Sequence, residues 1–147
     1  MAMQMTRSDD QAQVRGLIEE WINAARANDI GGVMAVYAPD IVSFDAIAQL
    51  QFKGRDAYRK HWQACMAMCP SPIFEIHDLD VETGDGVAFA HYLLRCGATG
   101  DDGKEQTGWM RVTVCLRKAG GRWAVAHEHF SAPFHPESGK ALLDLAP

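Results

Sequence analysis

Apolar residues recur every three or four positions in the first part of the chain, which is the spacing that places side chains on one face of an α-helix. In the first segment they are Val14, Leu17, Ile18, Trp21, Ile22 and Ala25. Ser8, followed three residues later by Gln11, forms a potential capping box that predicts the start of this helix. A second, shorter helix carrying Val33, Met34 and Tyr37 is predicted between Asp29, which can cap it, and Pro39, which ends it.

A third helix is predicted between Gly54 and Pro70, where one face carries Tyr58, His61, Trp62 and Cys65. Before it, residues 41–45 alternate in a β-rich composition that ends on the carboxylate of Asp45. After Pro72 the pattern is strand-like in four segments, separated by glycine-containing turns, at residues 73–82, 87–98, 107–118 and 123–134.

Helices followed by strands with short connections predict an α+β fold rather than an alternating α/β fold. We expect an antiparallel sheet of four long strands and a short one, with three N-terminal helices on one face. Because the long strands exceed the usual five or six residues, the sheet should curve strongly and leave a cone-shaped cavity around the first helix. The sequence has no repeat or linker, so residues 1–147 are expected to form a single domain.

Composition and charge narrow the function classes. The 14 basic and 19 acidic side chains leave a formal charge of −5, which disfavours binding to nucleic acids or anionic membranes. No segment approaches the roughly 20 apolar residues of a membrane span, and the start does not resemble a signal sequence, so a cytoplasmic location is expected. The four cysteines, which have no Cys-x-x-Cys spacing, are predicted to be reduced thiols: Cys65, Cys69, Cys96 and Cys115.

Three stretches carry a family resemblance: residues 21–45, the Phe-Lys-Gly-Arg-Asp-Ala-Tyr sequence from Phe52, and residues 121–133. They resemble the SnoaL-like and ketosteroid isomerase-like domains of the nuclear transport factor 2-like (NTF2-like) superfamily. The last stretch, which contains His-x-His-x-Ser-x-Pro, is similar to an uncharacterised branch related to the association domain of calmodulin-dependent kinase. The resemblance implies a cystatin-like fold with a ligand-binding pocket and a homodimer formed through the outer face of the sheet.

Asp45 is the first candidate catalytic residue. A carboxylate at a strand end, beside Phe44 and a helical hairpin, can be desolvated and serve as a general base. The resemblance aligns Asp45 with the proton-abstracting base of ketosteroid isomerases. The alternative is a strand-end carboxylate that only accepts a hydrogen bond from a loop amide. The two acidic hydrogen-bond donors of those isomerases align with Trp21 and Thr113, which are not acids, so steroid isomerisation is not expected.

Alternation along the third long strand places Trp109, Arg111 and Thr113 on one face, and Met110, Val112 and Val114 on the other. We predict that Arg111 faces the pocket and pairs with an anionic oxygen of the ligand, as the arginine-lined pocket of the kinase association domain implies. The alternative is an arginine on the outer face.

His91 is the predicted second acid or base. It shares a mostly apolar strand face with Val87, Phe89 and Leu93, and histidine exchanges protons near neutral pH. A core histidine whose ring is satisfied by the backbone is the alternative.

His127 and His129 share one strand face, and Glu128 and Phe130 share the other. The resemblance favours Glu128 and Phe130 facing the pocket and both histidines facing outward. Two histidines without a third ligand are a weak metal signal, so neither a metal nor another cofactor is expected. Further candidates for the cavity wall are Trp21, Tyr37, Trp62, Trp109 and Thr113.

Two classes of function follow from these residues. The first is a small-molecule-binding protein whose ligand is a small carboxylate or carbonyl compound. If the protein is an enzyme, we expect a cofactor-independent isomerase or lyase with Asp45 as general base and His91 as its partner. The second class is a non-catalytic module that forms a dimer through the sheet.

Overall fold

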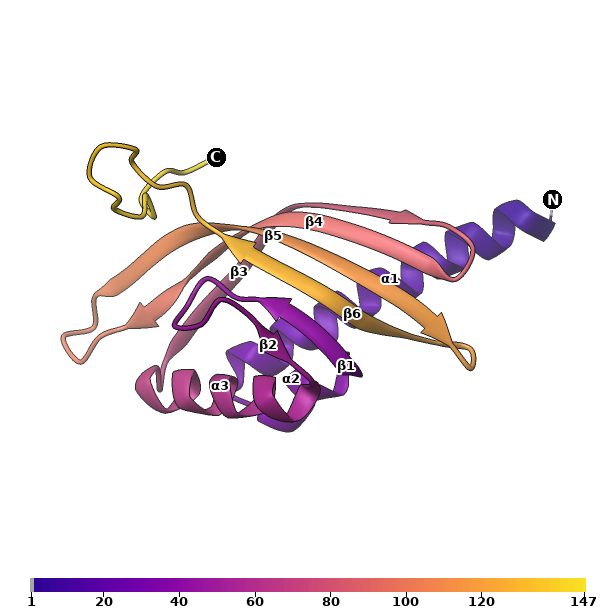
Figure 1. The fold of residues 1–147 in the computed structure, drawn as a ribbon, viewed down its shortest axis with the longest axis horizontal. Helices are drawn as coiled ribbons and strands as arrows, with labels where there is room; N and C mark the ends of the chain where they lie inside the picture. Colours follow the sequence, from indigo (N-terminus) through magenta and orange to yellow (C-terminus); the bar gives the residue numbers. More distant parts are fainter. Residues whose placement is uncertain (1) are drawn as a thin grey trace.

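The computed structural model describes the backbone of residues 2–147 and the side chains from Arg7 onward. In chain order its elements are α1 (Ala2–Arg26), α2 (Ile30–Ala35), β1 (Tyr37–Phe44), β2 (Phe52–Lys53), α3 (Arg55–Met68), β3 (Pro72–Thr83), β4 (Val87–Thr99), β5 (Glu105–Ala119) and β6 (Arg122–Ser131) (Figure 1). This order confirms the predicted α+β class, with helices first and long strands after them.

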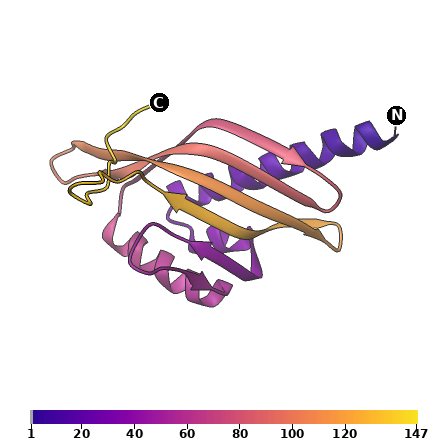
Figure 2. The same cartoon turned by 45° about the horizontal axis from the view of Figure 1, so that its top comes forward.

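The described strands form one six-stranded sheet in the order β2-β1-β6-β5-β4-β3. Strands β3 to β6 make the predicted antiparallel meander. β1 pairs parallel with β6, and the short β2 pairs with β1. The prediction of one short strand therefore missed β2, because two residues are too few to show a periodicity. The sheet curves around the helices, which lie on one side of it (Figures 1 and 2). We call the side toward the helices the inner face and the opposite side the outer face.

The helix boundaries correct two sequence predictions. α1 begins at Ala2, so Ser8 lies inside the helix and the predicted capping box does not mark its start. Tyr37 is the first residue of β1 rather than a residue of the second helix, since α2 ends at Ala35. The predicted cap at Asp29 is confirmed, because its Oδ1 accepts a hydrogen bond from the amide of Gly32 at 3.1 Å.

The core lies between α1 and the inner face of the sheet. The α1 residues that face it are buried at 5% exposure or less: Val14, Ile18, Trp21, Ile22 and Ala25. Alternate residues of β4 and β5 meet them, namely Ala90, Tyr92, Leu94, Val112, Val114 and Leu116. Each large apolar side chain buried in this way contributes about 1.5–3 kcal/mol. Burial of this one face decides which side chains of every strand point inward.

Asp10 connects α1 to the end of the sheet where β5 and β6 are joined. Its Oδ1 accepts hydrogen bonds from Lys118 Nζ at 3.0 Å and from Trp123 Nε1 at 3.2 Å. The hydrogen bond from Lys118 is the main reason why the pKa of Asp10 is lower than usual. The interaction holds the N-terminal half of α1 against the hairpin between β5 and β6.

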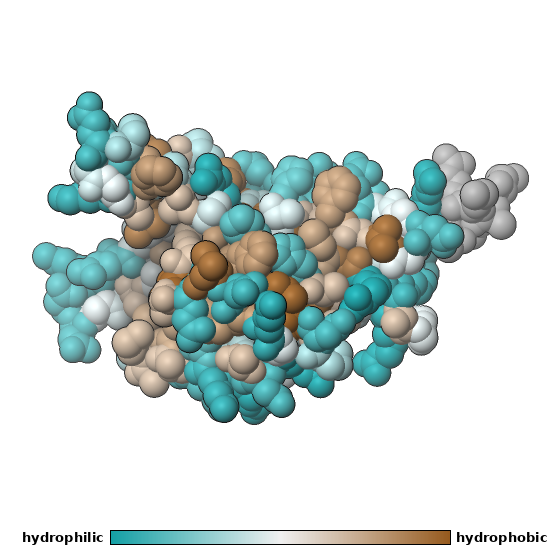
Figure 3. Space-filling view, viewed as in Figure 1, coloured by the Kyte–Doolittle hydropathy of each residue, from teal (hydrophilic) through white to brown (hydrophobic). Residues whose placement is uncertain are grey.

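The outer face of the sheet carries apolar side chains among polar ones (Figure 3). Its exposed large apolar residues include Val87 at 60%, Phe89 at 49% and Phe44 at 38% exposure. None of the helices in the described part of the chain combines the length and the hydrophobicity that a bilayer span requires.

Candidate active site

A cavity of about 120 Å³ lies between α3 and the inner face of the sheet, and we call it the α3 cavity. Most of its wall is apolar. Its lining includes the side chains of Asp45, His61, Trp62, Cys65, Leu94 and Phe130. The helical face that was predicted to carry Tyr58, His61, Trp62 and Cys65 therefore turns toward the sheet.

Asp45 directly follows β1 and meets His61 of α3 at the cavity wall. Asp45 Oδ1 lies 3.5 Å from His61 Nε2, and the two side chains are 12% and 9% exposed. The ring of His61 stacks on Phe52, with 4.2 Å between the ring centroids, which holds its orientation. Asp45 Oδ1 also accepts a hydrogen bond from the Ile47 amide at 3.0 Å. The carboxylate thus holds a loop amide and lines the cavity at the same time.

Tyr58 connects Asp45 to a second, fully buried carboxyl group. Its hydroxyl oxygen lies 3.0 Å from Asp45 Oδ2 and 3.0 Å from Glu128 Oε2. Tyr37 donates a hydrogen bond to the same Glu128 oxygen at 2.7 Å, and Trp21 Nε1 donates to the Tyr37 hydroxyl at 2.9 Å. A continuous series of hydrogen bonds therefore runs from α1 through β1, β6 and α3 to Asp45 at the cavity wall.

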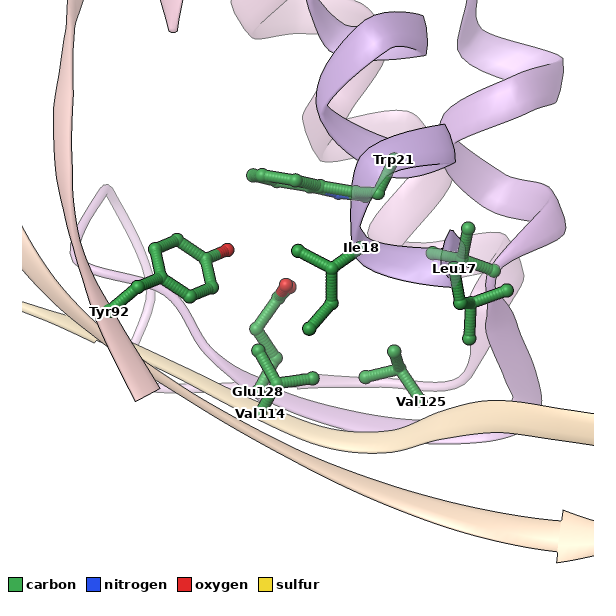
Figure 4. Close-up of a pocket in the computed structure, with 8 residues that line it drawn as sticks. Leu17, Ile18, Trp21, Tyr92, Val114, Val125 and Glu128 are labelled. Carbon is green, nitrogen blue, oxygen red and sulfur yellow. The ribbon is translucent and has the colours of Figure 1, made fainter. Parts of the chain in front are cut away.

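Glu128 is 2% exposed, and this burial raises its pKa to about 8. Hydrogen bonds from Tyr37 and Tyr58 act in the opposite direction, whereas the charge of Asp45 raises the pKa further. The apolar surroundings explain the dominant effect, since Ile18, Val114 and Val125 line the small pocket around the carboxyl group (Figure 4). Glu128 therefore carries its proton at neutral pH.

The proton of Glu128 sets the direction of these hydrogen bonds. A tyrosine hydroxyl has a single proton and can donate it to one acceptor only. When Glu128 is protonated, it donates to the Tyr58 oxygen, and Tyr58 in turn donates to Asp45 Oδ2. The buried acid and the tyrosine hold the Asp45 carboxylate in place without adding a second negative charge.

Cys65 lies beside His61 but is poorly suited to act as a nucleophile. Its sulfur is 3.8 Å from His61 Nε2, the same nitrogen that faces Asp45. Burial and the charge of Asp45 raise the pKa of the Cys65 thiol, so the unreactive protonated form is favoured. All four cysteines are free, as predicted. The Cys96 thiol, also at the cavity, has a pKa of about 11 because it is buried.

His91 does not lie at this site. It is on the outer face, where its side chain is 55% exposed and its Nε2 lies 3.5 Å from Asp80 Oδ2. The prediction that His91 and Asp45 face one pocket is wrong. The neighbours that made its strand face look apolar, Val87 and Phe89, are exposed as well. The buried face of β4 is formed by the residues that alternate with these along the strand.

The face of β5 that carries Trp109, Arg111 and Thr113 also points outward. Arg111 is exposed, and its Nε donates a hydrogen bond to Ser131 Oγ at 3.1 Å. The ring of Trp109 contacts His77, with 4.8 Å between the centroids. The predicted alternation is present, but the inward direction assigned to this set is wrong, because Met110, Val112 and Val114 occupy the interior. Among the described residues, the α3 cavity is lined by neither arginine nor lysine.

The other predicted residues do point inward. Trp62 and Phe130 line the α3 cavity, whereas Trp21, Tyr37 and Glu128 lie behind its wall in the hydrogen-bond series. His127 and His129 are on the outer face, where their rings pack against Phe44. Within the described chain, no three His, Cys, Asp or Glu side chains are arranged to hold a metal ion. Whether the inward residues bind a ligand stays a prediction.

Two residues of the site were missed as chemical groups, namely His61 and Tyr58. The sequence contained one feature that could have revealed His61. Its ionisable ring stands on the otherwise apolar face of the third helix, where burying a polar group without a partner costs free energy. Glu128 was predicted to face inward, but as part of the cavity wall rather than as a neutral buried acid.

The strongly curved sheet, the helices on its inner face and the small cavity between them define the cystatin-like, or NTF2-like, class of α+β proteins. The SnoaL-like domain family matches residues 14–135, and the chain belongs to this family. A solved NTF2-like protein of unknown function from Pseudomonas putida KT2440 is 50% identical. The match covers 95% of this chain and 98% of that one, with a TM-score of 0.89.

More distant structures share the fold. A candidate calcium/calmodulin-dependent protein kinase II association domain from Xanthomonas campestris is 23% identical over 84% of this chain and 86% of that one, with a TM-score of 0.71. A candidate dehydratase of the NTF2-like family from Streptomyces avermitilis is 15% identical over 84% and 96% of the two chains, with a TM-score of 0.74. Among curated proteins, none is significantly similar to this chain.

Proposed function

We propose that this protein binds a small, mainly apolar carbonyl compound in the α3 cavity and catalyses a cofactor-independent proton transfer on it, as an isomerase or a lyase. The observation that carries the proposal is the pair formed by Asp45 and His61. Both side chains are largely buried, their polar atoms are 3.5 Å apart, and both line the same apolar cavity. A buried pair of this kind is typical of general acid–base chemistry.

Asp45 is the proposed base. It takes a proton from the carbon next to the carbonyl group. The electron pair of the broken C–H bond forms a C=C bond, and the π pair of the carbonyl group moves to its oxygen, which gives an enolate. His61 is placed to give or receive a proton beside Asp45. The proton then returns to a different carbon in an isomerisation, or a group on the β carbon leaves in an elimination. Tyr58 and the protonated Glu128 keep Asp45 in position.

A neutral carbonyl compound fits the cavity better than the small carboxylate that the sequence also suggested. An anionic ligand would lie beside the Asp45 carboxylate, and Arg111, the expected counter-ion, is exposed on the outer face.

The test measures exchange of the hydrogens next to the carbonyl group for deuterium. A panel of simple ketones, including butanone and cyclohexanone, is incubated with the protein in D₂O, and the loss of proton signal is followed by NMR. Asp45→Asn is expected to lower the exchange rate by about 10² to 10⁴, the usual contribution of a general base. His61→Gln is expected to lower it as well.

His91→Gln is the matched control, because His91 and Asp80 form a pair with the same 3.5 Å separation on the exposed outer face. This variant is expected to exchange at the wild-type rate. Unchanged exchange in Asp45→Asn would show that Asp45 is not the base. A ketone that raises the melting temperature but is not exchanged would favour a binding protein without catalysis.

A second candidate function is assembly through the outer face of the sheet. The exposed Val87, Phe89 and Phe44 support it, because apolar side chains on a sheet face without covering helices are a common feature of dimer contacts. Phe89→Glu is expected to turn a dimer into a monomer in sedimentation velocity runs at micromolar concentration. A wild-type protein that sediments as a monomer would contradict this candidate. The expected cytoplasmic location and single-domain organisation stay predictions.

A further inference from the structure

We propose that the ligand extends from the α3 cavity into a second hollow beside the C-terminal segment, so that the substrate is a carbonyl compound with an elongated apolar chain. This inference rests on the proposed function of the α3 cavity. We call the second hollow the tail chamber. It has a volume of about 490 Å³, and its walls include Gly108, Ser131, Ala132, Ala141 and Leu143.

The tail chamber adjoins the α3 cavity. Four side chains line both of them, namely Ile47, Cys96, Met110 and Phe130. The α3 cavity alone, at about 120 Å³, is smaller than most small-molecule sites, which measure roughly 300–1,000 Å³. The tail chamber brings the available space into that range.

The two hollows differ in chemistry. Asp45 and His61 line the α3 cavity only, whereas the lining of the tail chamber includes no charged side chain among the described residues. The Cys96 thiol is a polar side chain in its lining, whereas the Ser131 hydroxyl is hydrogen-bonded to Arg111. A molecule that occupies both hollows therefore has its reacting carbonyl group at Asp45 and an apolar chain that points toward Leu143.

The C-terminal segment that walls the chamber is held by backbone hydrogen bonds. β6 pairs with β5 as far as Arg111 and Ser131, and beyond this point the Trp109 amide donates to the Leu143 carbonyl oxygen at 2.7 Å. The Leu142 amide donates to the Pro133 carbonyl oxygen, also at 2.7 Å. The segment thus takes the position beside β5 that β6 leaves, near the end of the sheet where β5 begins (Figures 1 and 2).

Gly108 allows this close approach. A Cβ atom at this position would lie 2.8 Å from Leu143 Cβ and 2.9 Å from the Leu143 carbonyl oxygen, which is closer than ordinary contact. The absence of a side chain at residue 108 lets the C-terminal segment lie directly on β5. The wall of the chamber is therefore part of the packed structure.

The experiment compares the affinity of the protein for 2-alkanones of increasing length, from butanone to 2-decanone, by calorimetry. Each additional methylene group that enters an apolar site is expected to improve the affinity about fourfold. Leu143→Trp, which fills the tail chamber, is expected to lose the gain in affinity for the longer ketones.

Leu145→Trp is the matched control. Leu145 lies two residues further along the same segment and is similarly exposed, at 55% compared with 44% for Leu143, but it lines a separate hollow with Leu93 and Arg111. This variant is expected to keep the wild-type dependence on chain length. Both positions are partly exposed, so neither substitution disturbs the core.

Three outcomes would overturn the inference. The first is an affinity for the ketones that does not depend on their chain length. If butanone still exchanges its hydrogens and Asp45→Asn still slows this exchange, the proposed function would stand. The second is the same chain-length dependence in Leu143→Trp and the wild type. The third is a wild-type dimer that Leu143→Trp dissociates in sedimentation runs, which would assign the tail chamber to a second copy of the chain. Loss of all ketone binding and exchange would instead remove the proposed function itself.

Discussion

Tyr37 donates a 2.7 Å hydrogen bond to Glu128 in the buried interior, although the two residues are 91 positions apart in the sequence. Parallel pairing of β1 with β6 brings them together, since Ser43 of β1 is the partner of Glu128 in the register. The contact places a carboxyl group where water does not reach it, and burial then raises its pKa. A neutral acid behind Asp45 is the result.

The raised pKa of Glu128 predicts that the protein loses stability as the pH rises. The folded state holds the proton up to about pH 8, whereas the unfolded chain releases it near the ordinary value of 4.5. The stabilising effect of this proton is therefore complete below pH 4.5 and is lost progressively up to about pH 8. In this window the free energy of unfolding should fall by roughly 1.4 kcal/mol per pH unit from this group.

Glu128→Gln tests this prediction, because the amide has a similar shape and does not titrate. Urea unfolding of both proteins at pH 5, 6, 7 and 8 gives the difference in their free energies of unfolding. Relative to the variant, the wild type should become less stable as the pH rises. A difference that is the same at every pH would mean that Glu128 is ionised in the folded protein.

Tyr58→Phe is expected to destabilise the protein by about 1–3 kcal/mol, because it removes a hydroxyl that joins two buried carboxyl groups. Asp45 also loses a hydrogen bond that positions it, so ketone exchange should slow. Tyr92→Phe is the matched control, since Tyr92 is similarly buried and its hydroxyl has no hydrogen bond to the described part of the chain. Equal losses of stability in the two variants would argue against the bridging role of Tyr58.

Asp10→Asn is expected to destabilise the folded protein at pH 7 and to have little effect in strong acid. The pKa of Asp10 is lower in the folded state than its ordinary value of 3.8, mainly because Lys118 donates a hydrogen bond to it. The stability that it contributes is therefore present above pH 3.8 and is lost as the pH falls through the lower, folded-state pKa. Asp9→Asn, at the exposed neighbouring position, is the control. Thermal unfolding at pH 7 and pH 2.5 measures both variants, and equal effects of the two substitutions at pH 7 would contradict the prediction.

Much of the fold was predictable because local patterns are strong where one face of each element is buried. The period of three to four residues along α1 and the alternation along β4 and β5 gave the correct elements, and the cap at Asp29 was correct in detail. The start of α1 was misplaced, because a capping sequence inside a longer helix looks the same as one at its start. β2 was missed because it contains only two residues.

The site was predictable only in part. Asp45 was recognised because it follows a strand directly, and the inward direction of Glu128 came from the family resemblance. His91 and Arg111 were placed on the wrong side of the sheet, since alternation separates the two faces of a strand without indicating which face is buried. On β4 the exposed face, with Val87 and Phe89, carries larger apolar residues than Ala88 and Ala90 of the buried face.

The sequence by itself determined the order of helices and strands and the division of each strand into two faces, because periodicity and turn residues are local properties. Only the tertiary structure decided which face became the interior, and hence that His61 rather than His91 lies beside Asp45. It also decided the raised pKa of Glu128, which depends on side chains from α1, β1, α3 and β4 that surround it. Desolvation and hydrogen bonding shift a pKa through groups that are close in space, and the chain brings those groups together only when it folds.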